Sequence, residues 1–134
     1  MGAWGAGTFD NDSALDWVAE LEKTSDLELI RSTFADTFEE EYLDADEGTC
    51  ALAAAEVVAA MAGHPGTIPD GVKAWIDRVD VELTPTDIAL ALRSAERVRA
   101  HDSELVELWS EGGGPDEFLD VLHELEARLH AAGA

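Results

Sequence analysis

The sequence predicts an all-α fold, a compact single-domain bundle or array of about six to seven short helices. Apolar residues recur at helical spacing through nearly every segment after residue 10, whereas the alternating β-branched pattern of strands is almost absent. The chain has 134 residues, a length at which one hydrophobic core is usual, and 46% of them are hydrophobic. We therefore expect one acidic helical domain over 1–134, with an N-terminal Gly- and Trp-rich arm at 1–11 packed on a helical body at 12–132.

The first two predicted helices combine polar starts with apolar faces. A helix over residues 12–23 would bury one face, made by Leu15, Trp17, Val18 and Leu21. A second helix is expected to begin near Ser25 or Asp26, because Ser25 and Glu28 have capping-box spacing. Its apolar face consists of Leu27, Ile30, Phe34 and Phe38. Both helices should therefore pack against the rest of the body through one side.

A third helix is expected from Cys50 to Ala62, and its pattern differs from the others. It is apolar on all sides apart from Glu56, and a helix of that kind is normally surrounded by other helices. Gly63 and Pro65 should end it, since Gly favours the C-terminal turn and Pro cannot continue a helix. We therefore place this helix at the centre of the fold.

Four more helices are expected in the second half of the chain, over about 69–79, 85–100, 103–111 and 115–132. The strongest start signal is Thr84-Pro85-Thr86-Asp87, in which Thr84 is the N-cap and Asp87 reaches back to it. The short helix at 103–111 has an apolar face of Leu105, Leu108 and Trp109. Short connections between all these helices indicate a bundle or array.

The charge of the chain excludes several function classes. It holds 30 acidic against 8 basic residues, which gives a net charge of −22 and a pI of about 4.1. Direct nucleic-acid binding needs clustered Lys and Arg, and anionic membranes would repel this surface. No run reaches the roughly 18 to 20 apolar residues of a bilayer span, and we find no signal peptide. We therefore expect a cytoplasmic protein that binds neither nucleic acid nor membrane.

The acidic excess is densest in the first half of the chain. Residues 1–56 hold 15 acids against only Lys23 and Arg31. A surface of this charge attracts a basic protein partner and speeds its association. The candidate partner surface consists of Glu39, Glu40, Glu41, Asp44, Asp46 and Glu47.

A second set of polar residues is singled out as functional or buried: Glu56, Asp10, Asn11, Asp12 and Asp16. Glu56 lies on a helix that should be buried, so it needs a groove, a partner or a proton. One interpretation is an ion pair with one of three arginines, Arg31, Arg93 or Arg97. The other is a divalent-metal site shared with the carboxylates of the N-terminal segment.

No residue is predicted to be catalytic, and no cofactor or metal site is predicted. The lone Cys50 excludes an internal disulfide and every multi-cysteine metal site, and its small apolar neighbours indicate a core position. Glu126 and His130 share one face of the last helix, which we interpret as exposed charge. Nucleophile elbows, phosphate loops and zinc motifs are absent from the sequence.

The opening run, MGAWGAGTFDNDSALDW, is distinctive as a whole. It resembles the start of the bacterial family catalogued as domain of unknown function 4259 (DUF4259), whose members begin with Met-Gly-x-Trp-Gly, followed by Phe-x-Asn-Asp-x-Ala and an Asp-Trp pair. The resemblance extends to AEVVAA at 55–60 and SELVELW at 103–109. It implies a small bacterial protein without assigned activity or catalytic residues. It also implies that the arm and its Asn11-Asp12 cap belong to the fold or to a shared surface.

These observations favour a non-enzymatic protein-binding or regulatory module over an enzyme, because no set of nucleophile, base and oxyanion donor can be assembled from the sequence. A structural or oligomerising module, with an exposed apolar face on one helix, is a further hypothesis, and two more specific alternatives remain open. One is a metal-dependent, hydrolase-like enzyme that uses Glu56 and the N-terminal carboxylates. The other is an inhibitor of the immunity or nucleic-acid-mimic type, which presents carboxylates to a basic partner.

Overall fold

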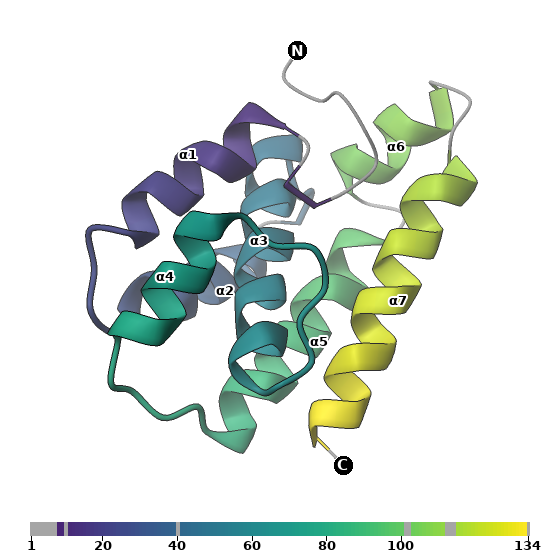
Figure 1. Cartoon of the computed structure of the whole chain (residues 1–134). Coiled ribbons are helices and arrows are strands. Elements are labelled where there is room, and N and C mark those ends of the chain that lie inside the picture. Colours follow the sequence, from purple (N-terminus) through teal and green to yellow (C-terminus); the bar gives the residue numbers. More distant parts are fainter. Residues whose placement is uncertain (1–7, 10, 40, 101–102, 112–114, 134) are drawn as a thin grey trace.

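The computed structural model describes residues 8–9, 11–39, 41–100, 103–111 and 115–133 (Figure 1). These residues form seven helices and no strand, which confirms the predicted all-α fold. The helices are α1 (Asp12–Leu21), α2 (Glu28–Thr37), α3 (Ala45–Met61), α4 (Asp70–Arg78), α5 (Pro85–Val98), α6 (Glu104–Glu111) and α7 (Pro115–Gly133).

Helix α3 lies at the centre of the array, as the sequence predicts (Figure 1). It contacts α1, α2, α5, α6 and α7. Every residue from Ala51 to Ala59 is buried, and the alanines among them have no exposed surface. Their short side chains let the neighbouring helices approach closely from all sides. Gly63, at a φ of 91°, ends the helix in a conformation that favours glycine.

Helix α3 begins at Ala45, five residues before the predicted start at Cys50. The Asp44 side chain accepts a hydrogen bond from the backbone N–H of Glu47 at 2.8 Å, so Asp44 is the N-cap. The first turn is acidic rather than apolar, and its negative charges are favourable at the positive end of the helix dipole. Because this turn has no apolar residues at helical spacing, hydrophobic periodicity does not reveal where the helix begins. Gly48 lies where α6 crosses, because a Cβ there would be 2.9 Å from Leu105.

Helix α2 begins later than predicted, at Glu28 instead of Ser25 or Asp26. The Ser25 hydroxyl does not cap the helix; it accepts a hydrogen bond from Arg78 of α4 at 3.2 Å. The Asp26 side chain accepts from the backbone N–H of Glu28 instead. The connection between α1 and α2 is therefore used to hold α4.

Three apolar residues that were expected on buried faces are exposed: Leu15 by 38%, Phe38 by 45% and Leu108 by 49%. In α1 the buried positions are Ala14, Trp17, Val18 and Leu21, so Ala14 replaces Leu15 on the face toward the core. Phe38 follows the end of α2 and caps it through its backbone. The Trp109 side chain and Trp4 lie outside the described part of the chain.

The predicted capping box of α5 is present. Thr84 Oγ1 accepts from the backbone N–H of Asp87, and the Asp87 side chain accepts from the backbone N–H of Thr84. Arg31 of α2 adds two hydrogen bonds to the same carboxylate, both at 2.9 Å. Its guanidinium, with the Thr84 hydrogen bonds, holds the pKa of Asp87 below its usual value although burial opposes this. The Asp87 carboxylate therefore caps the N-terminus of α5 and connects α5 to α2.

The variant Arg31→Met should lose stability in a pH-dependent way. A carboxylate whose pKa is lowered by folding contributes stability above its unfolded value of 3.8, and loses it as the pH falls through the folded value. We expect the wild type to exceed the variant in free energy of unfolding at neutral pH, and this difference to shrink below about pH 4. Urea unfolding across a pH series measures it.

Arg93→Met is the matched control, because Arg93 is exposed and forms no ion pair within the described part of the chain. Its effect should stay within about 0.5 kcal/mol at every pH. A constant difference between wild type and Arg31→Met down to pH 2 would contradict this assignment of the acid-sensitive contact.

Candidate functional site

The polar residues at the start of α1 have separate positions. Asn11 caps the helix, since its Oδ1 accepts from the backbone N–H of Ala14 at 2.8 Å. Its Nδ2 donates to the carbonyl of Thr8 at 3.2 Å, which fixes the described end of the arm. Asp12 and Asp16 are exposed on α1. Asp10 lies outside the described residues.

Glu56 is buried in the middle of α3, with 4% of its surface exposed. Its two carboxylate oxygens accept hydrogen bonds from the Arg128 guanidinium of α7, at 2.9 and 3.0 Å. The Thr8 hydroxyl donates to the same carboxylate at 3.3 Å. An ion pair was one of the two interpretations of Glu56, but the proposed partners Arg31, Arg93 and Arg97 are wrong. Glu56 therefore joins α3, α7 and the arm.

Arg128 gathers several acceptors around its planar head. Its Nε donates to Glu124 Oε1 at 2.6 Å, and its Nη1 also donates to the carbonyl of His64 at 3.3 Å. Gly66 leaves room for this guanidinium, because a Cβ there would lie 2.8 Å from Nη2. The loop that follows α3 is thus fixed by the same arginine.

The metal-hydrolase interpretation requires Glu56 in an open cleft beside the N-terminal carboxylates. Instead, Thr8 and Phe9 are buried and the Glu56 oxygens are taken up by Arg128 and Thr8. Among the described residues, no group of three His, Cys, Asp or Glu side chains is arranged to hold a metal ion. The geometry of Glu56 is that of a structural ion pair.

The last helix contains a similar pair that the sequence interpretation missed. Glu126 was expected to be exposed, but it is buried and accepts from Arg99, the C-cap residue of α5, at 2.7 and 3.2 Å. His130, which shares its helix, is exposed. The contact joins α5 to α7, and long-range pairs of this kind leave no spacing signal in the sequence.

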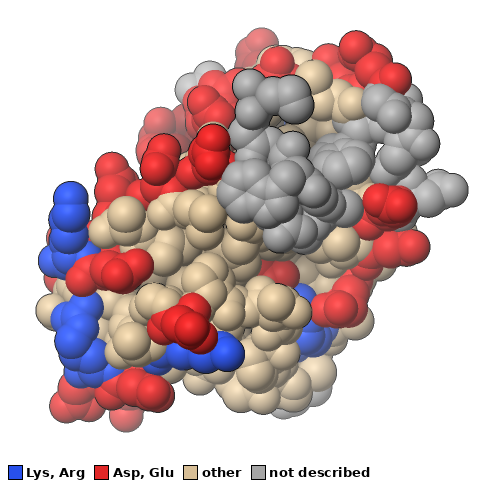
Figure 2. Space-filling view, turned by 45° about the horizontal axis from the view of Figure 1, so that its top comes forward, with Lys and Arg blue, Asp and Glu red and all other residues tan. Residues whose placement is uncertain are grey.

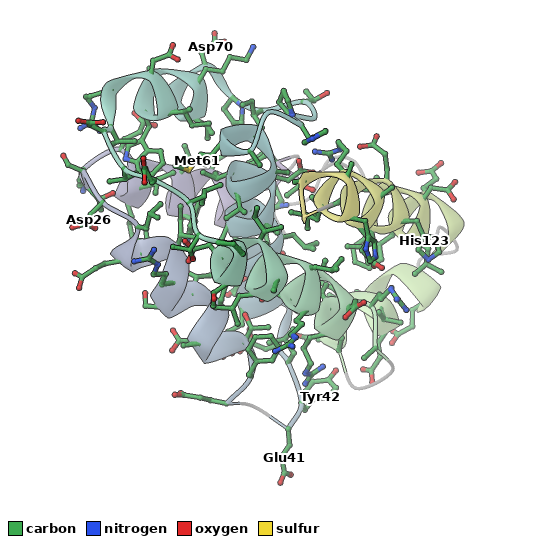
Figure 3. All side chains as sticks on the ribbon, turned by 90° about the horizontal axis from the view of Figure 1, so that it is seen from below. Asp26, Glu41, Tyr42, Met61, Asp70 and His123 are labelled. Carbon is green, nitrogen blue, oxygen red and sulfur yellow. The ribbon has the colours of Figure 1, made fainter. Side chains whose placement is uncertain are left out.

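The predicted partner surface between α2 and α3 is tied to the body at several points. The carbonyl of Glu41 accepts from Arg97, Asp44 caps α3, and Asp46 accepts from the Ser13 hydroxyl at 2.8 Å. The Glu41 side chain projects beyond the ribbon (Figure 3), and Glu39 is also exposed. Glu40 lies outside the described residues.

The same connection also contacts α6. Leu43 and Ser103 form an isolated bridge, and the Leu43 carbonyl accepts from the backbone N–H of Glu104 at 2.8 Å. The Tyr42 hydroxyl donates to Glu107 at 2.6 Å, which raises the pKa of Tyr42 to about 12. The acids of this segment are therefore held on an ordered surface.

A groove of about 280 Å³ lies between α1, α2 and α3. Its apolar lining includes Trp17, Leu29 and Cys50. Its acidic lining consists of Glu20, Asp36, Asp46 and Glu47. Asp46 and Glu47 belong to the predicted partner surface, whereas Glu20 and Asp36 were missed because they come from two other helices.

Cys50 lines this groove and is only partly buried, so it packs against the core from its edge and is not enclosed in it. Burial, together with the negative charges of Asp46 and Glu20, raises the pKa of the Cys50 thiol to about 11. Both causes disfavour the thiolate form of Cys50.

The similarity of this chain to a known family covers far more than the opening motif. The family model of a domain of unknown function (DUF4259) matches residues 2–121. The chain belongs to the DUF4259 family. The DUF4259 match includes Glu56 and the whole lining of the groove, while Arg128 lies beyond it. No curated protein and no solved structure matches this DUF4259 chain. Among its described helices, none has the length and apolar character that crossing a bilayer requires.

Removing the partner of Glu56 should destabilise the DUF4259 fold strongly. In Arg128→Met the buried carboxylate would lose its cation, which costs about 3 to 5 kcal/mol in comparable cases. The double variant Glu56→Leu, Arg128→Met replaces the pair by apolar side chains and should recover much of this loss. Urea unfolding of both variants measures the difference. If Arg128→Met were as stable as the double variant, the assignment of Glu56 and Arg128 as a buried ion pair would be contradicted.

Proposed function

We propose that this protein is a non-enzymatic binding or regulatory module that recognises a basic protein partner through the acids of its N-terminal half. The proposal rests on a difference between the basic and the acidic side chains. Most of the arginine side chains form contacts within the chain, whereas many acidic side chains face solvent. An unbalanced acidic surface remains for a partner.

Most of the arginines have intramolecular roles. Arg31, Arg99 and Arg128 each bind a buried carboxylate through two hydrogen bonds. Arg78 donates to the backbone carbonyls of Glu22 and Thr24 at 2.9 and 3.1 Å. These cations neutralise interior carboxylates or bind carbonyls at the C-terminal end of α1, so they offset little of the charge on the surface.

The exposed acids are numerous over α1, α2 and the start of α3. On the face in Figure 2, acidic side chains occupy much of the rim, while most basic ones gather toward one end. The exposed acids of the described residues up to 47 are Asp12, Asp16, Glu20, Glu22, Asp26, Glu28, Asp36, Glu39, Glu41, Asp44 and Asp46. Such a field steers a basic protein toward this side and repels nucleic acid.

The proposal predicts binding that is both salt-dependent and local to this surface. A partner captured from the native host and then purified should bind the wild type with an affinity that falls steeply between about 50 and 300 mM salt. The triple variant D12N/D16N/E39Q should weaken that binding at low salt, because it removes exposed charges without touching a described side-chain hydrogen bond. Isothermal titration calorimetry measures both effects.

The matched control is E82Q/E117Q/D120N, which changes the net charge equally but on exposed positions in the second half of the chain. It should weaken binding less than the N-terminal triple variant does. Salt-independent binding, or an equal loss in the two triple variants, would contradict the assignment of the partner surface.

A further inference from the structure

The groove between α1, α2 and α3 combines an apolar floor with polar groups that are already satisfied. The Trp17 indole N–H donates to the Thr33 hydroxyl at 3.0 Å, and that hydroxyl donates to the Leu29 carbonyl at 2.7 Å. Trp17 and Leu29 therefore present hydrocarbon to the groove without an unmet hydrogen-bond donor. An aliphatic stem could lie along this floor and bury apolar surface.

The rim of the groove is acidic on the sides of all three helices. Glu20, Asp36 and Asp46 are exposed there, and no lysine or arginine is among the described lining residues. Neither Glu20 nor Asp36 forms an ion pair within the described part of the chain. The charges of Asp46 and Glu20 add to burial in raising the pKa of the Cys50 thiol. The groove therefore complements a cation.

The spacing of the carboxylates and the size of the groove indicate which kind of cation would fit. The described carboxylates are not grouped closely enough to hold a metal ion, so a compact inorganic cation does not fit. A volume of about 280 Å³ is just below the roughly 300–1,000 Å³ of small-molecule pockets. A second copy of the chain would bring another −22 of charge. An extended side chain with an apolar stem and a positive end matches both the floor and the rim.

We infer that this groove receives an arginine or lysine side chain from a basic segment of the partner protein. The stem lies along Trp17 and Leu29, and the charged end lies beside Glu20 and Asp36. Neighbouring basic residues of the segment meet the exposed acids that flank the groove, which favours a protein segment over a free small amine. The inference rests on the proposed function and gives it a specific anchoring point.

The test uses the full chain, isotope-labelled for NMR, with hexa-arginine peptide as the probe at about 50 mM salt. The largest shifts should occur at the Trp17 indole N–H and at the amides of Leu29, Thr33 and Cys50. The variant E20Q/D36N should weaken the affinity about tenfold. D12N/D16N removes the same charge from exposed sites outside the groove lining, and should weaken the affinity about threefold at most.

Three results would overturn the inference. Shifts spread evenly over the acidic surface, with equal losses in the two double variants, would mean that binding is general; the proposed function would survive this result. Groove shifts produced equally well by spermidine would mean that the groove serves a free polyamine. Absence of peptide binding at low salt would count against both the groove and the basic-partner function.

Discussion

The structure depends on one constraint, which is that the stretch of α3 from Ala51 to Ala59 has no side facing solvent. Five helices contact α3, so the shape of each must fit the same short, mostly alanine surface. Close packing of this kind tolerates little change in volume. The one charged residue in its buried stretch, Glu56, must then be neutralised from outside the helix, and Arg128 provides the charge from α7. The position of α7 and the fixing of the arm by Thr8 follow from that requirement.

The buried ion pairs also affect the charge of the surface. In a chain with 8 basic residues, three arginines are committed to buried carboxylates: Arg31 to Asp87, Arg99 to Glu126 and Arg128 to Glu56. Each pair joins helices that are distant in sequence, so the cations hold the array together. The acids that these pairs leave outside are concentrated on α1, α2 and the start of α3. Because these arginines pair with buried carboxylates, they do not balance the acidic residues on the surface.

Much of this fold could be predicted from local sequence, and the rest required tertiary information. Periodicity located seven helices, and the uniformly apolar pattern around Glu56 indicated the central one. The acidic first turn of α3 has no periodic signal, although Asp44 three residues before Glu47 is a capping pattern that could have revealed it. The partner of Glu56 is 72 residues away, and the groove combines side chains from three helices. Neither leaves a local pattern.

Native-state hydrogen exchange tests most directly whether the array is built around α3. Amides of buried core elements exchange only through global unfolding, at a free energy of about 5 to 15 kcal/mol for a typical domain. The amides from Ala51 to Ala59 should be the slowest in the protein and share one free energy of opening, equal to that of global unfolding. Amides of α3 that exchange faster than those of α1 or α7 would contradict it.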